Sequence, residues 1–219
     1  MKRRIIIICA GLLMALPIVA QELRPGVLAG LNLNAPSNME SRYGFRMGVK
    51  GELTFPKVVK GLYAESGLAI SSLPWKSEKY IYPKNGFIRY AKAAPCFLNI
   101  PLRAGFKLNC GRFAKFYVNA GPYLNIGLFG NIKEFLRDTN NEPLPWYNAD
   151  PSGYFDYVGS DHIVDWGLGF GTGIEVASHY QVSLGYEWGM RDIMKSSFDD
   201  RIIFDSRMRT FTLQLAYMF

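Results

Sequence analysis

The strongest constraint on the fold is a strict alternation of apolar and polar residues, seen clearly over residues 43–55. In this stretch, YGFRMGVKGELTF, the odd positions are apolar or glycine, and the even positions are glycine, charged or threonine. A period of two places successive side chains on opposite faces of an extended chain. The stretch is therefore predicted to form a strand with one apolar face and one polar face.

The same alternation recurs along the chain, whereas the 3.6-residue period of an amphipathic helix does not appear. It predicts strands at roughly 26–34, 43–55, 61–72, 94–107, 114–128, 163–176, 180–191 and 209–219. We therefore expect an all-β fold, an eight-stranded antiparallel up-and-down transmembrane β-barrel. The last strand must pair with the first, because an unpaired edge cannot be exposed to lipid.

Strand length and the polar faces indicate a membrane barrel rather than a soluble one. Several predicted strands have about ten residues or more, as a tilted bilayer-spanning strand requires, whereas soluble strands have a mode of about 5–6. The polar faces are rich in glycine and carry balanced charges, Arg46, Lys50, Arg103, Lys107 and Arg191 against Glu52, Glu65, Asp165, Glu175 and Glu187. We expect these charges to pair inside a narrow lumen, and the apolar faces to contact lipid.

Connection lengths and aromatic residues predict an orientation. The links at 35–42, 73–88, 129–162 and 192–208 are long, and those at 56–60, 108–113 and 177–179 are short. Outer-membrane barrels have long extracellular loops, short periplasmic turns and two aromatic girdles. The periplasmic girdle is expected to contain Phe55, Phe106, Phe116, Tyr180, Tyr217 and Phe219, and the outer girdle Tyr43, Phe45, Trp166 and Trp188.

The N-terminus has the organisation of a secretory signal peptide. Lys2, Arg3 and Arg4 precede the apolar residues 5–16, and PIVA at 17–20 provides a cleavage site. We therefore expect a cleaved signal peptide at residues 1–20 and one barrel domain at residues 21–219. Cleavage changes the count from 25 basic and 18 acidic residues to 22 and 18, so the formal charge falls from +7 to +4. An exported chain without a basic helix is not expected to bind nucleic acid.

Six segments carry a resemblance to a known family: GVLAGLNLN (26–34), LNIPLRAGF (98–106), NAGPYLNIGL (119–128), WGLGFGTGIEV (166–176), YEWGMRDI (186–193) and LQLAYMF (213–219). They are similar to the PorT-like, or outer membrane protein β-barrel domain, family of small Gram-negative barrels. The resemblance implies a cell outer membrane location and, for some members, an association with protein secretion. It also implies that the barrel assembly machinery recognises the last strand, which ends at Phe219.

The glycine run GLGFGTG at residues 167–173 is the first candidate site. Its glycines alternate within a predicted strand and no helix follows, so a phosphate-binding loop is disfavoured. We instead expect the glycines to form a bare inward strip against which Tyr117 and Tyr123 lie. The side chains of an eight-stranded barrel are enough to fill its interior.

The third long link holds the other candidates. His162 with Ser160 and Asp161 suggests a hydrolase site, but adjacent side chains on a strand point to opposite faces, and His179 is weaker still. The same link combines Trp146, Tyr147, Tyr154, Phe155 and Tyr157 with Asp150, Asp156 and Asp161. This mixture suits a glycan, a partner protein or a calcium ion. A loop folded over the barrel mouth is the favoured interpretation.

Two further local features yield expectations. Pro101 and Pro122 interrupt predicted strands of a closed barrel, so we expect β-bulges there. Cys96 and Cys110 are 14 residues apart along extended chain, and about 45 Å of separation disfavours a disulfide between them.

The sequence thus favours a non-enzymatic outer-membrane barrel with a side-chain-filled lumen. It is expected to contact outer-membrane lipid and to act through its extracellular loops in a structural, adhesive or secretion-associated role, with an extracellular or secretion-system protein as partner. A narrow porin-like channel for small solutes is the alternative, and an outer-leaflet lipid-modifying enzyme is a third. No catalytic, cofactor-binding or metal-binding residue is predicted.

Overall fold

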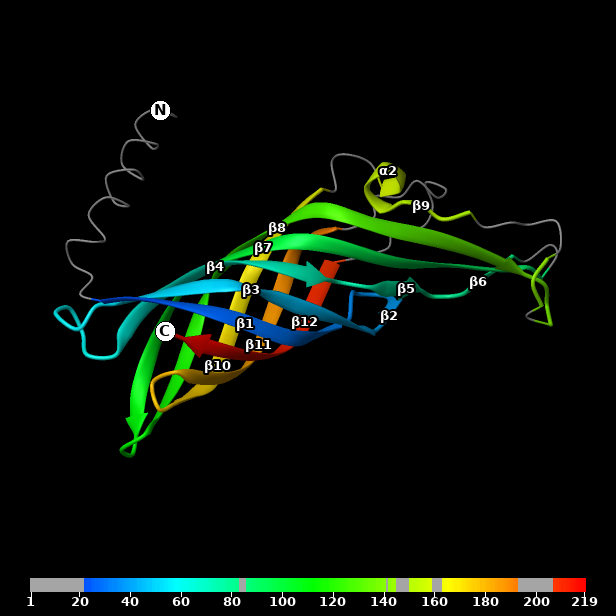
Figure 1. Ribbon diagram of the computed structural model, residues 1–219. Coiled ribbons are helices and arrows are strands. Elements are labelled where there is room, and N and C mark those ends of the chain that lie inside the picture. Colours follow the sequence, from blue (N-terminus) through cyan, green and yellow to red (C-terminus); the bar gives the residue numbers. More distant parts are fainter. Residues whose placement is uncertain (1–21, 83–85, 141, 145–149, 159–162, 193–206) are drawn as a thin grey trace, which may run out of the picture.

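The computed structural model describes residues 22–82, 86–140, 142–144, 150–158, 163–192 and 207–219. The predicted signal peptide, residues 1–20, lies outside these residues. Eight long strands of the described chain form the wall of a barrel (Figure 1). They are β1 (Glu22–Asn34), β3 (Arg42–Thr54), β4 (Leu62–Ser72), β7 (Ile88–Cys110), β8 (Ala114–Arg137), β10 (Val164–Val176), β11 (Tyr180–Asp192) and β12 (Arg207–Met218).

The long strands pair in an unbroken antiparallel ring. Each pairs with the next long strand in the sequence, and β12 pairs with β1, so that Gly26 lies opposite Met218 and Asn34 opposite Thr210. At the C-terminus, the backbone N–H of Phe219 donates to the carbonyl of Pro25 at 2.9 Å. The predicted all-β, up-and-down barrel closed by its last strand is confirmed.

The two ends of the ring differ, as the connection lengths predict. At one end of the barrel, called here the turn end, short turns connect consecutive strands. These turns are Phe55–Gly61, Gly111–Phe113 and Ala177–His179. Gly111, in one of the two three-residue turns, has a φ of +84°, a left-handed conformation that favours glycine. The long connections lie at the opposite end, called here the loop end.

The apolar side chains face outward on every long strand. One exposed residue from each strand, in ring order, is Leu31, Met47, Leu68, Leu102, Val118, Phe170, Leu184 and Leu213. Each of these is between 46% and 61% exposed. The intervening polar side chains are buried inside, which is the inverse of a soluble barrel. No helix in the described part of the chain is long and apolar enough to cross a membrane.

The aromatic girdles are largely as predicted. The exposed members are Tyr43, Phe45, Phe116, Trp166, Tyr180, Trp188, Tyr217 and Phe219, and Phe106 is half-buried. Phe55 was expected at the rim but is only 9% exposed. It follows the last residue of β3, and its carbonyl accepts from the N–H groups of Val58 and Val59. The chain therefore turns at Phe55, and its side chain is buried and departs from the alternation of the strand.

Two strands extend much further than the sequence predicts. Strands β7 and β8 stay paired from Cys110 opposite Ala114 to Ile88 opposite Arg137, beyond the predicted bounds 94–107 and 114–128. Residues 88–95 and 129–137 thus form an arm beyond the ring at the loop end (Figure 1). Short strands flank the arm: β2 (Met39–Glu40), β5 (Trp75–Ser77), β6 (Tyr80–Ile81) and β9 (Ser152–Gly153).

The loop-end mouth is closed by an apolar cluster, called here the cap. Its buried members are Leu73, Trp75, Ala93, Phe97, Ile132, Tyr154 and Met208, with Met39, Ala91 and Phe155 packed against them. Tyr154 begins the short helix α2 (Tyr154–Val158), whereas Met208 comes from β12, several strands away around the ring from β7. The cluster therefore spans the mouth, and for its described residues the third long link folds over the barrel as predicted.

The bulges predicted at Pro101 and Pro122 are wrong. The β7–β8 register is unchanged across Pro101, since Leu98 lies opposite Ile126 and Ala104 opposite Ala120. Pro101 itself pairs with Tyr123, and the ladder lacks only the pairs at Leu102 and Arg103. The register places Leu102 opposite Pro122, which has no N–H to donate, so pairing is lost there without an inserted residue. The actual register shift of this pair lies between Cys96 and Phe97, where the arm begins.

Candidate functional site: the filled lumen

The interior of the barrel is lined by polar side chains from all eight long strands. Alternation alone places them there, because the residues between the outward apolar positions point inward. The buried set includes Asn32, Lys50, Glu65, Asn99, Asn119, Glu175, Gln181 and Thr212, one from each strand. A site in the lumen is therefore built by the wall itself and needs no inserted loop.

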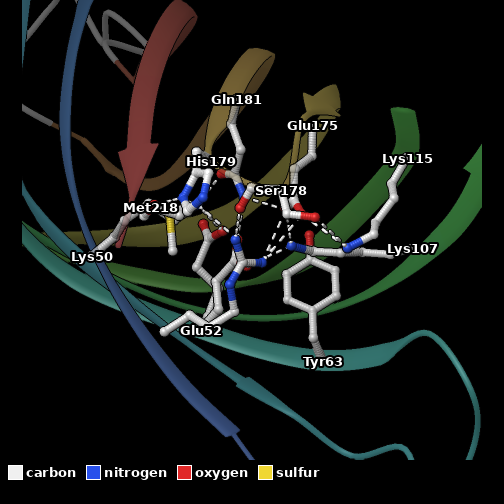
Figure 2. Close-up of polar contacts among 12 residues, drawn as sticks. Lys50, Glu52, Tyr63, Lys107, Lys115, Glu175, Ser178, His179, Gln181 and Met218 are labelled. Carbon is white, nitrogen blue, oxygen red and sulfur yellow. Dashed lines mark hydrogen bonds and ion pairs between the residues drawn. The ribbon is translucent and has the colours of Figure 1, made fainter. Parts of the chain in front are cut away.

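The turn end of the lumen holds a dense ionic network (Figure 2). Lys107 Nζ lies 2.5 Å from a carboxylate oxygen of both Glu52 and Glu175. The Gln181 amide donates to the same two carboxylates at 2.9 Å each. Glu52 and Glu175 are fully buried, so each charge is compensated by several donors rather than by water.

Two further cations complete this end of the lumen. Arg24 Nη1 and Lys115 Nζ each lie 3.2 Å from Glu175 Oε1. Arg24 also donates to the carbonyl of Ser178, in the turn between β10 and β11. Arg24 is not among the predicted lumenal charges because it precedes the predicted first strand, which starts at residue 26. Lys115 lies on the same face of β8 as Tyr117 and Asn119, because these are alternate residues of one strand. The alternation was therefore sufficient to predict that Lys115 faces the lumen.

A second group of ion pairs crosses the middle of the lumen. Glu187, only 2% exposed, accepts from Arg46 at 2.7 Å and from Arg103 at 2.9 Å. Lys50 donates to Glu65 at 2.6 Å and to the side-chain amide oxygen Oε1 of Gln181 at 3.0 Å, which joins the middle group to the turn-end network. The predicted pairing of inward charges is confirmed for these residues and for those at the turn end.

The loop end of the lumen is mostly neutral. Asn99 donates to Asn125 at 2.7 Å, and Asn125 donates to Asp165 at 3.2 Å. Among the ion pairs of the described residues, none includes Asp165, whose carboxylate also accepts from the Tyr123 hydroxyl at 3.4 Å. Arg191 was expected to pair inside the lumen, but its guanidinium donates to the exposed carbonyl of Val164 at 3.0 Å. These two charges therefore depart from the predicted network.

The inward glycine strip of β10 accommodates large neighbours, as predicted. A Cβ added to Gly173 would lie 2.7 Å from the Tyr117 hydroxyl oxygen, and one added to Gly167 would lie 2.9 Å from the Tyr123 ring. Such separations are too short for van der Waals contact, so the tyrosines occupy the volume that side chains would fill. This glycine run is part of a filled lumen and not a phosphate-binding loop.

Small spaces are present between these side chains. Two cavities of about 20 Å³ each lie near mid-lumen, and both are lined by Arg46, Lys50, Glu65 and Arg103. A cavity of this size accommodates about one water molecule. The Nε atoms of Arg46 and Arg103 and the Asn119 Oδ1 atom have no protein hydrogen-bond partner. The cavities thus offer polar sites for single water molecules.

The remaining candidates are placed as follows. Ser160, Asp161, His162, Trp146, Tyr147 and the side chain of Tyr157 lie outside the described residues. His179 lies in a short turn, where its Nδ1 atom is 2.7 Å from the Met218 carbonyl and its ring stacks on Tyr217.

Cys96 and Cys110 are free and lie 14 residues apart on β7. In the described chain, no group of three or more His, Cys, Asp or Glu side chains is placed to hold a metal ion.

A barrel that is apolar outside, polar inside and closed by its last strand matches a known family. The family model described as "Outer membrane protein beta-barrel domain" covers residues 19–195. The chain belongs to this family. The protein is accordingly an outer-membrane protein. The comparison with curated proteins finds no match.

Solved outer-membrane barrels are similar to the chain at low identity. Neisserial surface protein A is 14% identical with a TM-score of 0.41, over 90% of this chain and 95% of that one. Ail of Yersinia pestis, solved in complex with the heparin analogue sucrose octasulfate, is 12% identical with a TM-score of 0.38, over 91% and 100%. The N-terminal barrel domain of Pseudomonas aeruginosa OprF is 10% identical with a TM-score of 0.32, over 89% and 97%.

Proposed function

We propose that the protein is a non-enzymatic outer-membrane barrel that conducts no solute and acts through its loop-end surface, in a structural, adhesive or secretion-associated role. The observation that carries this proposal is the filled and capped lumen. Three layers stand in series along it: the turn-end network, the ion pairs of Glu187 and the apolar cap. A solute would have to disrupt all three.

The energetics of the ionic layers support a closed lumen. Glu52 and Glu175 are fully buried, and each contacts more than one cation. Removing one partner of a buried pair typically costs about 3–5 kcal/mol, because the other charge is left without compensation. Opening a path through such a network separates several pairs at once, so the closed arrangement is strongly favoured.

The partners belong to the same proposal. In the described chain, the arm and the cap are the parts that extend beyond the ring at the loop end, so an extracellular or secretion-system protein would bind there. The finer PorT-like assignment, and recognition of the strand ending at Phe219 by the barrel assembly machinery, rest on the resemblance of the quoted segments.

Single-channel conductance tests the closed lumen. The mature chain is refolded, its folding is verified by heat-modifiable gel mobility, and it is inserted into planar bilayers beside a known porin as a positive control. We expect no conductance steps from the folded protein. Steady openings that scale with the amount of folded protein would overturn the proposal.

The two mid-lumen cavities favour a narrow channel as the second candidate, since polar, water-sized spaces beside Arg46 and Arg103 are what a single-file path contains. If openings are observed, the variant Arg103→Ala distinguishes a lumenal path from leakage around the barrel. A lumenal path predicts a change in unitary conductance and ion selectivity, whereas leakage at the lipid boundary predicts none.

A further inference from the structure

Three lysines form a row across the arm. Lys76 of β5 lies directly opposite Lys92 of β7, which lies directly opposite Lys133 of β8. The neighbouring residues Ala93 and Ile132 face the cap, so Lys92 and Lys133 face the other way. That outward face continues the lipid-facing surface of the barrel. The three residues are called here the lysine row.

The row has an excess of positive charge that the arm does not neutralise. Like charges directly opposite on neighbouring strands destabilise a sheet. Lys76 contacts the Glu40 carboxylate at 2.5 and 2.6 Å, but among the described residues neither Lys92 nor Lys133 forms an ion pair. The row therefore has three cations and one carboxylate, which contacts Lys76 alone, and this excess of positive charge suits an external anion.

Aromatic rings hold the lysine side chains in place. Tyr90 and Phe135 stack with ring centroids 4.9 Å apart and planes at 9°. Lys92 Nζ lies 4.9 Å and Lys133 Nζ 5.7 Å from the Phe135 centroid, and Lys76 Nζ lies 5.3 Å from that of Tyr90. Cation–π contacts of this length keep the ammonium groups together on one surface.

The position of the row along the barrel indicates what it meets. Phe129, which is 60% exposed on β8, precedes Lys133 by four residues. Four residues of strand span about 13 Å. Exposed aromatic residues mark the boundary of the hydrocarbon layer, and Phe129 is the last exposed aromatic residue along β8. The row therefore lies just above that boundary, at the depth of lipid headgroups.

We propose that the lysine row binds the phosphate groups of a phosphorylated glycolipid headgroup in the outer leaflet. The charge of the row, its outward face and its continuity with the lipid-facing surface all favour this ligand. Ammonium groups donate charge-assisted hydrogen bonds to phosphate oxygens, which an uncharged headgroup does not accept as strongly. The inference goes beyond the proposed function, because it holds whether or not the barrel conducts.

The test measures the affinity of the folded full-length mature chain for diphosphoryl lipid A in neutral detergent micelles. The same titration with fully dephosphorylated lipid A, and with inorganic phosphate alone, separates a lipid headgroup from a free ion. The double variant Lys92→Gln/Lys133→Gln removes two charges of the row. The matched control Lys57→Gln/Lys60→Gln removes two exposed lysines at the turn end. Heat-modifiable mobility verifies that each variant folds.

We expect a loss of roughly fivefold in affinity per lysine removed, hence roughly 30-fold for the double variant, with little change in the control. Glu40→Gln frees Lys76 and is expected to tighten binding, a gain that misfolding cannot imitate. Equal affinities of wild type and the double variant would overturn the proposal. Equal losses in the two double variants, equal binding of the dephosphorylated lipid, or binding of phosphate as tight as that of lipid A would do so too.

Discussion

Arg46 and Glu187 lie 141 residues apart in the chain but form a 2.7 Å ion pair inside the barrel. The pair joins β3 to β11, which are not neighbours in the sheet. It therefore ties opposite parts of the wall together across the lumen. Because Arg103 of β7 contacts the same carboxylate, one acidic residue holds three strands.

The variant Glu187→Gln tests the energetic value of this contact. It keeps the volume of the side chain but leaves the buried Arg46 guanidinium and the largely buried Arg103 guanidinium without this counter-charge. We expect the free energy of unfolding to fall by about 3–5 kcal/mol, as measured by denaturant titration of the micelle-bound barrel. Glu22→Gln makes the same chemical change at an exposed position and should change stability by no more than about 0.5 kcal/mol. Similar values for the two variants would show that the network stabilises little.

The packing of the lumen is tested by two glycine substitutions on paired strands. Gly173→Ala brings a Cβ to within 2.7 Å of the Tyr117 hydroxyl and 2.4 Å of the Val182 carbonyl. We expect a destabilisation of about 1–3 kcal/mol from overpacking. Gly185→Ala is the matched control, because its Cβ would be 3.6 Å from its nearest neighbour. The same denaturant titration should show no loss for it, and a loss equal to that of Gly173→Ala would contradict this account of the packing.

The alternation of apolar and polar residues predicted which residues face the lumen and which face outward. In a strand, odd-numbered and even-numbered residues lie on opposite faces, so this assignment needs only the sequence. It identified Arg46, Glu187 and the glycine strip as lumenal without any knowledge of pairing. It did not predict which lumenal charges form ion pairs. Two lumenal charges meet only if they lie at the same level along the barrel axis, and the stagger between strands sets that level. Asp165 shows this limit: it points inward as expected, but its neighbours there are Asn125 and Tyr123.

The arm was missed for a related reason. Over residues 88–95 each face of β7 mixes polar and apolar side chains: Lys92 lies on the outward face with Tyr90, and Arg89 has the same strand face as Ala93 of the cap. Such a segment has no clear apolar-polar alternation, so the sequence pattern does not predict a strand there. Phe55 was misplaced because parity applies only while the chain remains extended, and β3 ends at Thr54.

The cap is tested by Tyr154→Ala. Tyr154 is fully buried, and its ring lies 6.2 Å from that of Trp75 and 5.0 Å from that of Phe155. Truncating a buried aromatic side chain typically costs about 3–5 kcal/mol, so α2 should detach from the mouth while the barrel stays folded. Limited proteolysis should then cleave the link between β8 and β10 much faster. Asp156→Ala, at an exposed position of the same helix, should leave the cleavage rate unchanged.

The orientation of the barrel is tested by thiol labelling. Cys110 is exposed at the turn end, and Cys96 is buried near the loop end. A bulky membrane-impermeant maleimide should label neither cysteine in intact cells, and Cys110 alone once the outer membrane is permeabilised. The variant Cys110→Ser/Asn140→Cys places the exposed thiol beyond β8 at the loop end and should be labelled in intact cells. Labelling of wild-type Cys110 from outside would reverse the assigned orientation.

Recognition of the last strand is tested by Phe219→Ala. The Phe219 side chain is 65% exposed, and its ring contacts only the edge of Tyr217 among the aromatic pairs of the described chain. Its loss should therefore change the stability of the refolded barrel by less than about 1 kcal/mol. If the barrel assembly machinery recognises this residue, the amount of folded protein in the outer membrane should nevertheless fall severalfold. That amount is measured by heat-modifiable gel mobility of membrane fractions. Phe211→Ala truncates another exposed phenylalanine of β12 and should leave that amount near wild type. Equal amounts of Phe219→Ala and wild-type barrel would mean that closure of β12 against β1, and not the terminal ring, is what assembly requires.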